Sequence, residues 1–449
     1  MFLRHLSLYL FTLVSSATAA LPPIHYTISR RGGSFPAPDT ANLTYLLEQV
    51  KVVEQRYSAT TRTFSGNKVV RKPKRVHGTQ AGAALLGEAS RDGNWFASLH
   101  IGDPMQEVDM DLDMLTADFW ILSTSIDSEN PLAFPTCRQP KDLVHLPTIQ
   151  RSVPLSFAHC RPSKQWIRSL LPSGAYLGLA PSTALSQTKT MSLMPQLVEK
   201  QIIDTPIWSI MLANRKEGIF SIGGTSVASV REVERETEDS LARLGHQKSE
   251  RSFTINDAPR REDGDKLSEW KWMKVQGAEG WWQILMRGVF VEGIKILDSQ
   301  PVVLDINTPF IIAPPLAART FYASISGSKR LSPPYDQFHA YPCFNLPRIN
   351  FEFDQWNVQV LNAKRDKGTF SPGGRFSLGR MTRGSGFCIG TIIESRVGIS
   401  TSDARESNSK VHVDGGNGLS DVWIIGEPFY RDVQVAFHWR DKLVGMQRA

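Results

Sequence analysis

Two aspartates occupy matching positions in two similar stretches of the chain. Asp113 lies in LDMLTADFW (112–120) and Asp305 in LDINTPFII (304–312), each at the end of an apolar run and three residues before a threonine. They are 192 residues apart (305 − 113), which fits one carboxylate in each half of a duplicated molecule. Two carboxyl groups held close cannot both ionise, so they share one proton. Such a pair can act on a water molecule as general base and general acid.

The similarity of the two halves extends beyond the aspartates. Each half also contains two apolar residues followed by glycine, in Tyr176-Leu177-Gly178 and in Ile424-Ile425-Gly426. A lone aspartate in a chain rich in strands is usually a turn residue. The paired motif is therefore what marks Asp113 and Asp305 as candidates for chemistry.

Other chemistry finds less support. Asp109, Asp111 and Asp113 alternate and so face one side of a strand, where they could bind a cation, but the stretch lacks the glycine and the closing glutamate of an EF-hand. A polar strand edge is the simpler explanation for Asp109. No Gly-x-Ser-x-Gly motif of a serine hydrolase occurs, and we predict no metal and no cofactor.

Two cysteines lie in each half of the body: Cys137 and Cys160, and Cys343 and Cys388. Of the three possible pairings, the local one closes short loops, and we predict the disulfides Cys137–Cys160 and Cys343–Cys388. A zinc site of the first pair with His145 and His159 is the alternative, but its spacing matches no usual pattern of zinc ligands.

Short alternating runs split by Gly and Pro begin near Trp95 and predict successive strands. The clearest runs are 95–102, 106–114, 118–124, 206–212, 218–224, 281–293, 301–306 and 348–353. Helical spacing is best at 191–201 and 314–325. The pattern predicts a mostly-β body with small helices.

The basic charge of the chain is concentrated near its start. The first 19 residues have the basic start, apolar run and small-residue cleavage site of a secretory signal peptide. Residues 20–75 hold 10 Lys/Arg against 3 Asp/Glu and end in the dibasic pair Lys74-Arg75, whereas the remainder holds 40 against 41. We predict a basic prosegment over 20–75, with a basic loop of the mature domain as the alternative, and no binding of nucleic acid by the body. The sequon at Asn42 predicts N-glycosylation.

A charged stretch divides the body. Residues 226–269 hold 8 Lys/Arg and 11 Asp/Glu among 44 residues, which predicts a solvated insertion between an N-terminal lobe (76–225) and a C-terminal lobe (270–449). After residue 20 no run of eighteen apolar residues occurs, so we predict no membrane span.

The body from about Trp95 resembles the pepsin-like aspartic peptidases. The matching segments follow the order of that family: IGDPMQ (101–106), LDMLTADFW (112–120), YLGLAP (176–181), GIFSIGG (218–224), LDINT (304–308), YPCFNLPRINFEF (341–353) and IIGEPFYRDVQVAF (424–437). The resemblance covers roughly three-quarters of the chain. The leader and basic prosegment are similar to those of the family's secreted, fungal-type zymogens.

The resemblance implies a bilobal, pseudo-duplicated β fold of the pepsin type. It implies that Asp113 and Asp305 form a catalytic dyad, with Thr116 and Thr308 bonding the outer carboxylate oxygens. The expected protein is a monomer, secreted or vacuolar, that cleaves proteins or peptides in an interlobe cleft at acidic pH without a cofactor. Its own prosegment is the expected partner, through Lys68 or Lys72.

The diagnostic motif is altered at four positions. Where the family has threonine and glycine after each aspartate, this chain has Met114 and Leu115, and Ile306 and Asn307. The cross-lobe threonine hydroxyl network therefore cannot form, and leucine suits a tight turn poorly. The family's Tyr-Gly-x-Gly flap motif, whose tyrosine covers the substrate, is also missing. Trp166 is a weak candidate to replace that tyrosine. These changes favour a second hypothesis, an inactive homologue that binds peptide in the cleft.

Overall fold

The computed structural model describes residues 23–30, 39–64, 94–123, 136–146, 151–161, 175–181, 192–213, 217–225, 270–276, 281–354, 356–361, 374–396 and 421–449. Several predictions lie outside these residues: the signal peptide (1–19), Lys68, Lys72, the pair Lys74-Arg75, Trp166 and the charged insertion (226–269).

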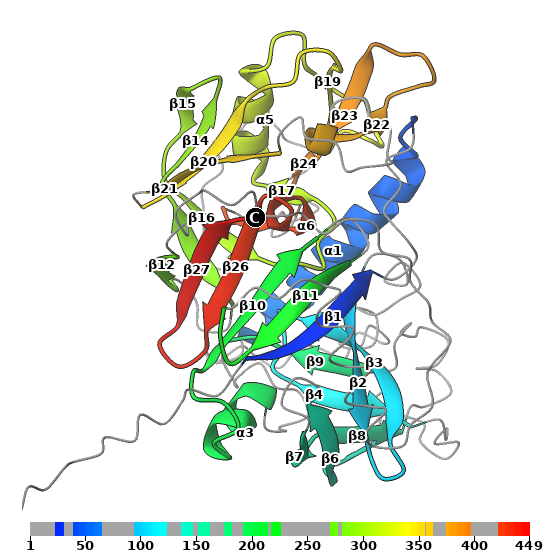
Figure 1. Cartoon of the computed structure of the whole chain (residues 1–449). Helices are drawn as coiled ribbons and strands as arrows, with labels where there is room; N and C mark the ends of the chain where they lie inside the picture. Colours follow the sequence, from blue (N-terminus) through cyan, green and yellow to red (C-terminus); the bar gives the residue numbers. More distant parts are fainter. Residues whose placement is uncertain are drawn as a thin grey trace, which may run out of the picture.

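The fold is mostly β and bilobal, with one group of strands towards the top of the molecule and one towards the bottom (Figure 1). The predicted strands are present as β2 (Trp95–Ile101), β3 (Gln106–Asp113), β4 (Phe119–Leu122), β10 (Ile207–Leu212), β11 (Glu217–Ile222), β16 (Gln300–Leu304) and β20 (Ile349–Phe353). The predicted run 281–293 is not one strand, because Arg287 separates β13 (Gln283–Met286) from β14 (Gly288–Val291) and the two join different sheets.

A 14-stranded sheet joins the halves of the molecule, in the order β12-β27-β26-β10-β11-β1-β2-β3-β9-β4-β8-β5, with β6 paired to β2 and β7 paired to β6. Its remaining strands are β1 (Ile24–Arg30), β5 (Thr136–Arg138), β6 (Lys141–Leu146), β7 (Arg151–Ser156), β8 (Ala158–Arg161), β9 (Ala175–Gly178), β12 (Lys271–Lys274), β26 (Val433–His438) and β27 (Leu443–Arg448). The first described strand, β1, therefore lies inside the sheet, between β11 and β2.

Three smaller sheets complete the second half. One has the order β13-β16-β25-β17-β24, one β15-β14-β20-β21 and one β18-β19-β23-β22. The strands not yet bounded are β15 (Ile294–Leu297), β17 (Ile311–Ala313), β18 (Lys329–Arg330), β19 (His339–Pro342), β21 (Trp356–Val360), β22 (Ser377–Arg380), β23 (Phe387–Gly390), β24 (Ile392–Glu394) and β25 (Trp423–Ile425).

Each aspartate ends the first strand of a repeated four-strand unit. In the first half β3 runs parallel to β9, β9 antiparallel to β4, and β4 parallel to β8. In the second half β16, β25, β17 and β24 repeat these three relations in the same order. The internal repeat predicted from the two aspartate motifs is thus a repeat of backbone topology.

The glycine of each apolar-apolar-glycine motif lies against the turn that follows an aspartate. A Cβ atom on Gly178 would lie 2.3 Å from the backbone nitrogen of Asp118, and one on Gly426 would lie 1.9 Å from the carbonyl oxygen of Thr308. Only glycine permits this approach, which lets Leu179 N–H donate to the Asp113 carbonyl (2.7 Å). The two glycines therefore hold the aspartate turns in matching positions.

The helices are few, and the longest described one was not predicted. Both predicted helices are present as α3 (Leu193–Glu199) and α5 (Pro315–Ala323), beside the short α6 (Glu427–Tyr430) and the 3-10 helix η5 (Gly374–Phe376). The additional helix is α1 (Leu43–Phe64), in the predicted prosegment. Among the described helices, none has the length and apolar character needed to cross a bilayer.

Both predicted disulfides are present, Cys137–Cys160 and Cys343–Cys388. The zinc alternative is wrong, because the thiols it needs are bonded to each other and the described residues hold no cluster suited to a metal. Disulfides are typical of proteins that mature in an oxidising compartment, which agrees with secretion.

A buried ion pair connects β1 with the first residue of α6. Arg30 Nε lies 3.0 Å from Glu427 Oε2, and both side chains are 1% exposed. Arg431 also donates to the Glu427 carboxylate. Apolar residues of β1 (Ile24, Tyr26 and Ile28) are buried in the principal core. The N-terminal strand is therefore an integral part of the folded chain.

Removing the charge of Glu427 should destabilise the protein strongly. Glu427→Gln leaves two buried guanidinium groups without their carboxylate, and breaking a buried pair in this way costs about 3 to 5 kcal/mol. Urea unfolding at neutral pH will measure the loss in the free energy of unfolding.

The matched control is Asp354→Asn, which breaks an ion pair with Arg287 in which both side chains are about half exposed, 45% and 49%. Exposed pairs contribute under about 1 kcal/mol. Equal losses in the two variants would contradict a structural role for the Arg30–Glu427 pair.

Candidate active site

The turn after β3 holds the Asp113 carboxylate with two short-range donors. The backbone N–H of Leu115 donates to Asp113 Oδ1 (3.0 Å), and Thr116 Oγ1 donates to Oδ2 (2.8 Å). The side chain of Asp113 is 13% exposed, so it is largely shielded from water.

The turn after β16 repeats these contacts atom for atom. Asn307 N–H donates to Asp305 Oδ1 (3.1 Å), and Thr308 Oγ1 donates to Oδ2 (2.8 Å). Asp305 is fully buried. The two threonines thus make the contacts that the resemblance implies, and each carboxylate has one oxygen bonded by backbone and one by hydroxyl.

The residues in place of glycine do not prevent these turns. Neither Leu115 nor Asn307 has a positive φ, so neither backbone needs glycine. The Leu115 side chain, 3% exposed, is buried in an apolar cluster, and its N–H still reaches Asp113. The unfavourable backbone conformation expected at Leu115 is therefore absent.

One guanidinium brings the two carboxylates together. Arg56 Nη2 lies 3.6 Å from Asp113 Oδ1, and Arg56 Nη1 lies 3.6 Å from Asp305 Oδ2. Both aspartates, from opposite halves of the chain, are therefore in contact with the same cation. The neighbouring Tyr57 donates its hydroxyl hydrogen to Asp305 Oδ2 (3.2 Å).

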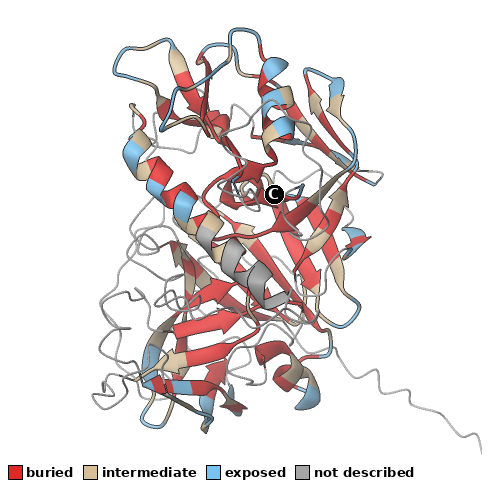
Figure 2. Ribbon diagram, turned by 180° about the vertical axis from the view of Figure 1, so that it is seen from behind, coloured by how far each residue is buried: buried red, intermediate tan, exposed pale blue. Residues whose placement is uncertain are grey.

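Helix α1 carries Arg56 and Tyr57 and packs on both halves. It crosses the middle of the molecule between the two groups of strands (Figure 2). Its buried apolar side chains belong to a cluster that also holds Leu115 and Ala180 from the first half and Phe310 from the second; they are Leu46, Leu47, Val50, Val53 and Tyr57. The α1 helix therefore covers the aspartates directly.

Polar contacts at other points of the helix fix its position. Asn42 Oδ1 accepts from Tyr45 N–H (3.1 Å), which caps the first turn. Glu54 Oε1 accepts from Gln337 Nε2 (2.8 Å) and from Arg396 N–H (2.6 Å), both in the second half. Arg56 is therefore placed by a helix anchored along its length.

Burial dominates the electrostatics around the aspartates. Burial raises the pKa of Asp113, and Arg56 and the two hydrogen bonds offset only part of this. Burial would lower the pKa of Arg56, but Asp305 and Asp113 outweigh it and raise that pKa. Burial and the charge of Asp305 raise the pKa of Tyr57 well above its usual value, so the phenol remains a donor.

The two other aspartates of β3 have local partners. Asp109 accepts from Ser98 Oγ (2.6 Å), and the fully buried Asp111 accepts from Asn94 Nδ2 (3.0 Å). Within the described ranges, no group of three or more His, Cys, Asp or Glu side chains is arranged to hold a metal ion.

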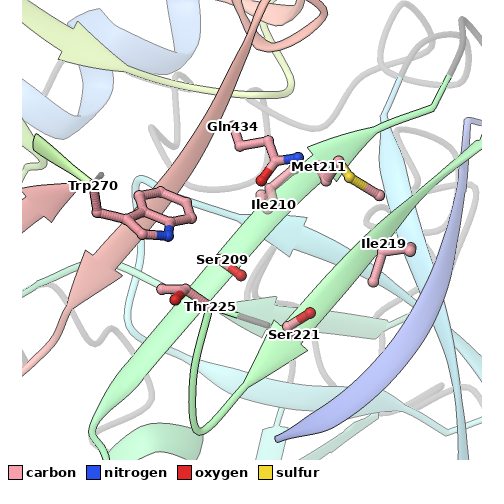
Figure 3. A pocket seen from close by; sticks show the side chains of 8 residues that line it. All are labelled: Ser209, Ile210, Met211, Ile219, Ser221, Thr225, Trp270 and Gln434. Atoms are coloured by element: carbon pink, nitrogen blue, oxygen red, sulfur yellow. The ribbon is translucent and has the colours of Figure 1, made fainter. Parts of the chain in front are cut away.

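A small open hollow lies on the shared sheet (Figure 3). Its lining comes from β10, β11, β26 and the residues near them: Ser209, Ile210, Met211, Ile219, Ser221, Thr225, Trp270 and Gln434. Neither aspartate contributes to it, so it is separate from the candidate active site.

Sequence analysis missed Arg56 and Tyr57. The signal was nevertheless present, because Asn42 is a good cap and Leu46, Val50, Val53 and Tyr57 follow a helical spacing. The proposed lysines 68 and 72 lie outside the described residues, and an arginine of α1 contacts both carboxylates.

The pKa of Asp113 gives a signed prediction for stability. Because its folded pKa is raised, this carboxyl contributes fully to the free energy of unfolding below about pH 4, and the contribution is lost as pH rises through the raised value. The free energy of unfolding of Asp113→Asn, relative to wild type, should therefore increase between about pH 4 and pH 7.

Urea titrations of both proteins across this range will measure the difference, with the exposed Asp354→Asn as control. A relative stability of Asp113→Asn that falls with rising pH would show that Arg56 outweighs burial.

Comparison with known proteins gives a partial similarity. No family model matches the chain. The chain is 22% identical over 179 residues to "Major aspartyl peptidase 1" of Cryptococcus neoformans var. grubii, across 38% of this chain and 31% of that protein. The match thus spans about a third of the relative's length. It agrees with the resemblance to pepsin-like aspartic peptidases and reaches no further than that family.

Proposed function

We propose that this chain is a secreted, pepsin-like aspartic endopeptidase whose N-terminal segment covers its active site. One observation carries the proposal: a single guanidinium contacts two carboxylates from opposite halves. Each carboxylate accepts one hydrogen bond from a backbone N–H and one from a threonine hydroxyl. The disulfides and the partial similarity to an aspartyl peptidase support it.

In the proposed reaction α1 leaves and a water molecule takes the place of the Arg56 guanidinium. Two carboxylates that face one cation at 3.6 Å repel each other once it is gone, so they retain one proton between them. The ionised carboxyl then takes a proton from water as the water oxygen attacks the carbonyl carbon of the peptide, while the protonated carboxyl donates its proton to the carbonyl oxygen. The resulting diol collapses as the C–N bond breaks; its hydroxyl proton returns to one carboxylate, and the other carboxyl gives its proton to the leaving amine nitrogen. Thr116 and Thr308 keep the carboxyl groups oriented throughout.

The alternative is a homologue that binds peptide without cleaving it. It is favoured by the cluster in which Leu115 is buried together with the apolar side chains of α1. A groove that already holds a helical segment through apolar contacts could hold other chains in the same way. The presence or absence of turnover separates the two functions.

Loss of either aspartate should abolish peptidase activity. We expect protein cut after Arg75 by a dibasic-specific protease to cleave a denatured protein substrate between about pH 3 and 6, where such a dyad works. Asp113→Asn and Asp305→Asn should each lower kcat by about 10³-fold or more, because the two groups act as a unit. Asp109→Asn is the matched control.

Substrate cleavage that survives both substitutions would exclude this dyad. No cleavage by the wild-type protein, together with saturable binding of peptide, would establish the alternative.

Weakening the α1 contact should activate the uncut chain. Arg56→Gln removes the cation between the carboxylates, so the helix should leave the site more readily, and residual activity at acidic pH should rise by about tenfold, the equivalent of one charged hydrogen bond. Lys51→Gln removes the same charge from the exposed face of α1 and is the control. Initial rates of substrate cleavage by the two uncut variants will test this. Equal rates would show that Arg56 does not block the site.

A further inference from the structure

We propose that Asn307 and Met114 are positioning residues that bind the two aspartate turns to each other across the lobe boundary. The proposal rests on the proposed function in so far as the aspartates are catalytic. The threonine hydroxyls that would make this connection are absent from the sequence, but other atoms bridge the two turns.

The Asn307 side chain uses both ends of its amide on the opposite half. Its Nδ2 donates to the carbonyl oxygen of Leu112, and its Oδ1 accepts from the N–H of Trp95 (2.8 Å). Leu112 precedes Asp113, and Trp95 begins β2. Because Asn307 N–H also bonds the Asp305 carboxylate, a single residue connects that carboxylate with the backbone next to Asp113.

The Met114 sulfur supplies a second connection. Its Sδ lies 3.3 Å from the backbone nitrogen of Ile306 and 3.6 Å from the hydroxyl of Tyr430, both in the second half. Ile306 follows Asp305 directly, so this contact fixes the backbone beside the second carboxylate. Thioether sulfur is a weak hydrogen-bond acceptor, and here it accepts from a backbone N–H, which is a strong donor.

The two contacts are complementary. Asn307 and Leu115 occupy equivalent positions in the repeat, as do Met114 and Ile306. In each equivalent pair one side chain bonds across the boundary and the other, Leu115 or Ile306, is apolar and buried. Asn307 (5% exposed) and Met114 (1% exposed) are themselves buried, where an unpaired backbone group is costly. The contacts therefore fix the position of one aspartate turn relative to the other.

Hydrogen exchange tests the contact, and kinetics test its effect on the dyad. In the full chain, Asn307→Leu should speed exchange of the Trp95 N–H by about tenfold, the effect of one lost hydrogen bond. In the cut protein, kcat should fall by about 10- to 100-fold while KM changes less than about threefold, because misplaced carboxyl groups impair the reaction rather than binding. Asn350→Leu, which loses a bond to Asn357 within one hairpin, is the control.

A second variant keeps the test open if Asn307→Leu does not fold. Met114→Leu conserves volume and removes only the sulfur, so exchange of the Ile306 N–H should rise by about tenfold and kcat should fall with KM retained. Met286→Leu, at another fully buried position, is its control.

Exchange and kcat that match the controls in both variants would overturn the proposal. Faster exchange with unchanged kcat would overturn the positioning role. A wild-type protein without peptidase activity would instead overturn the proposed function, and unchanged exchange in the variants would still overturn the connection itself.

Discussion

Two buried carboxylates facing one another are the constraint on which this structure depends. Asp113 and Asp305 are both buried, and burying an ionised carboxylate costs hydration free energy. The charge of Asp305 also repels that of Asp113. Hydrogen-bond donors in each turn and one guanidinium, which contacts both carboxylates, offset this cost. Any state without Arg56 must supply a proton in its place. The same constraint thus connects the covered form, in which Arg56 faces both carboxylates, with the proposed open form, in which a shared proton takes the place of that cation.

The N-terminal segment contributes to the fold and to the site in different ways. Strand β1 is held inside the shared sheet by backbone pairing and by the buried Arg30–Glu427 pair. Helix α1 packs on both halves, and Arg56 in its C-terminal half contacts the aspartates. Glu427 also bonds through its N–H to the carbonyl of Thr308, beside the Asp305 turn. The two attachments therefore meet close to the Asp305 turn.

Sequence reasoning predicted the parts that repeat. The paired aspartates, their threonines, the motif glycines and most strands follow from local spacing, because alternation and turn chemistry are local properties. Helix α1 was missed although its cap and apolar spacing were present, because the segment was interpreted from its net charge, and net charge carries no helical period. The run 281–293 was taken as one strand because it has no Gly or Pro before Gly288. Which distant residue meets the aspartates could not be predicted, because that depends on how a helix docks.

The altered motif shows why residue identity alone predicts a site poorly. Leu115 and Asn307 looked damaging because glycine is the family's residue, yet the hydrogen bonds to each aspartate use backbone N–H groups that every residue except proline possesses. The missing hydroxyl network looked equally serious, but what the turns require is a donor and an acceptor at the boundary. An amide and a thioether supply these from Asn307 and Met114. Geometry is conserved here by exchanging the chemical groups that produce it, so the substitutions by themselves do not show that the site is inactive.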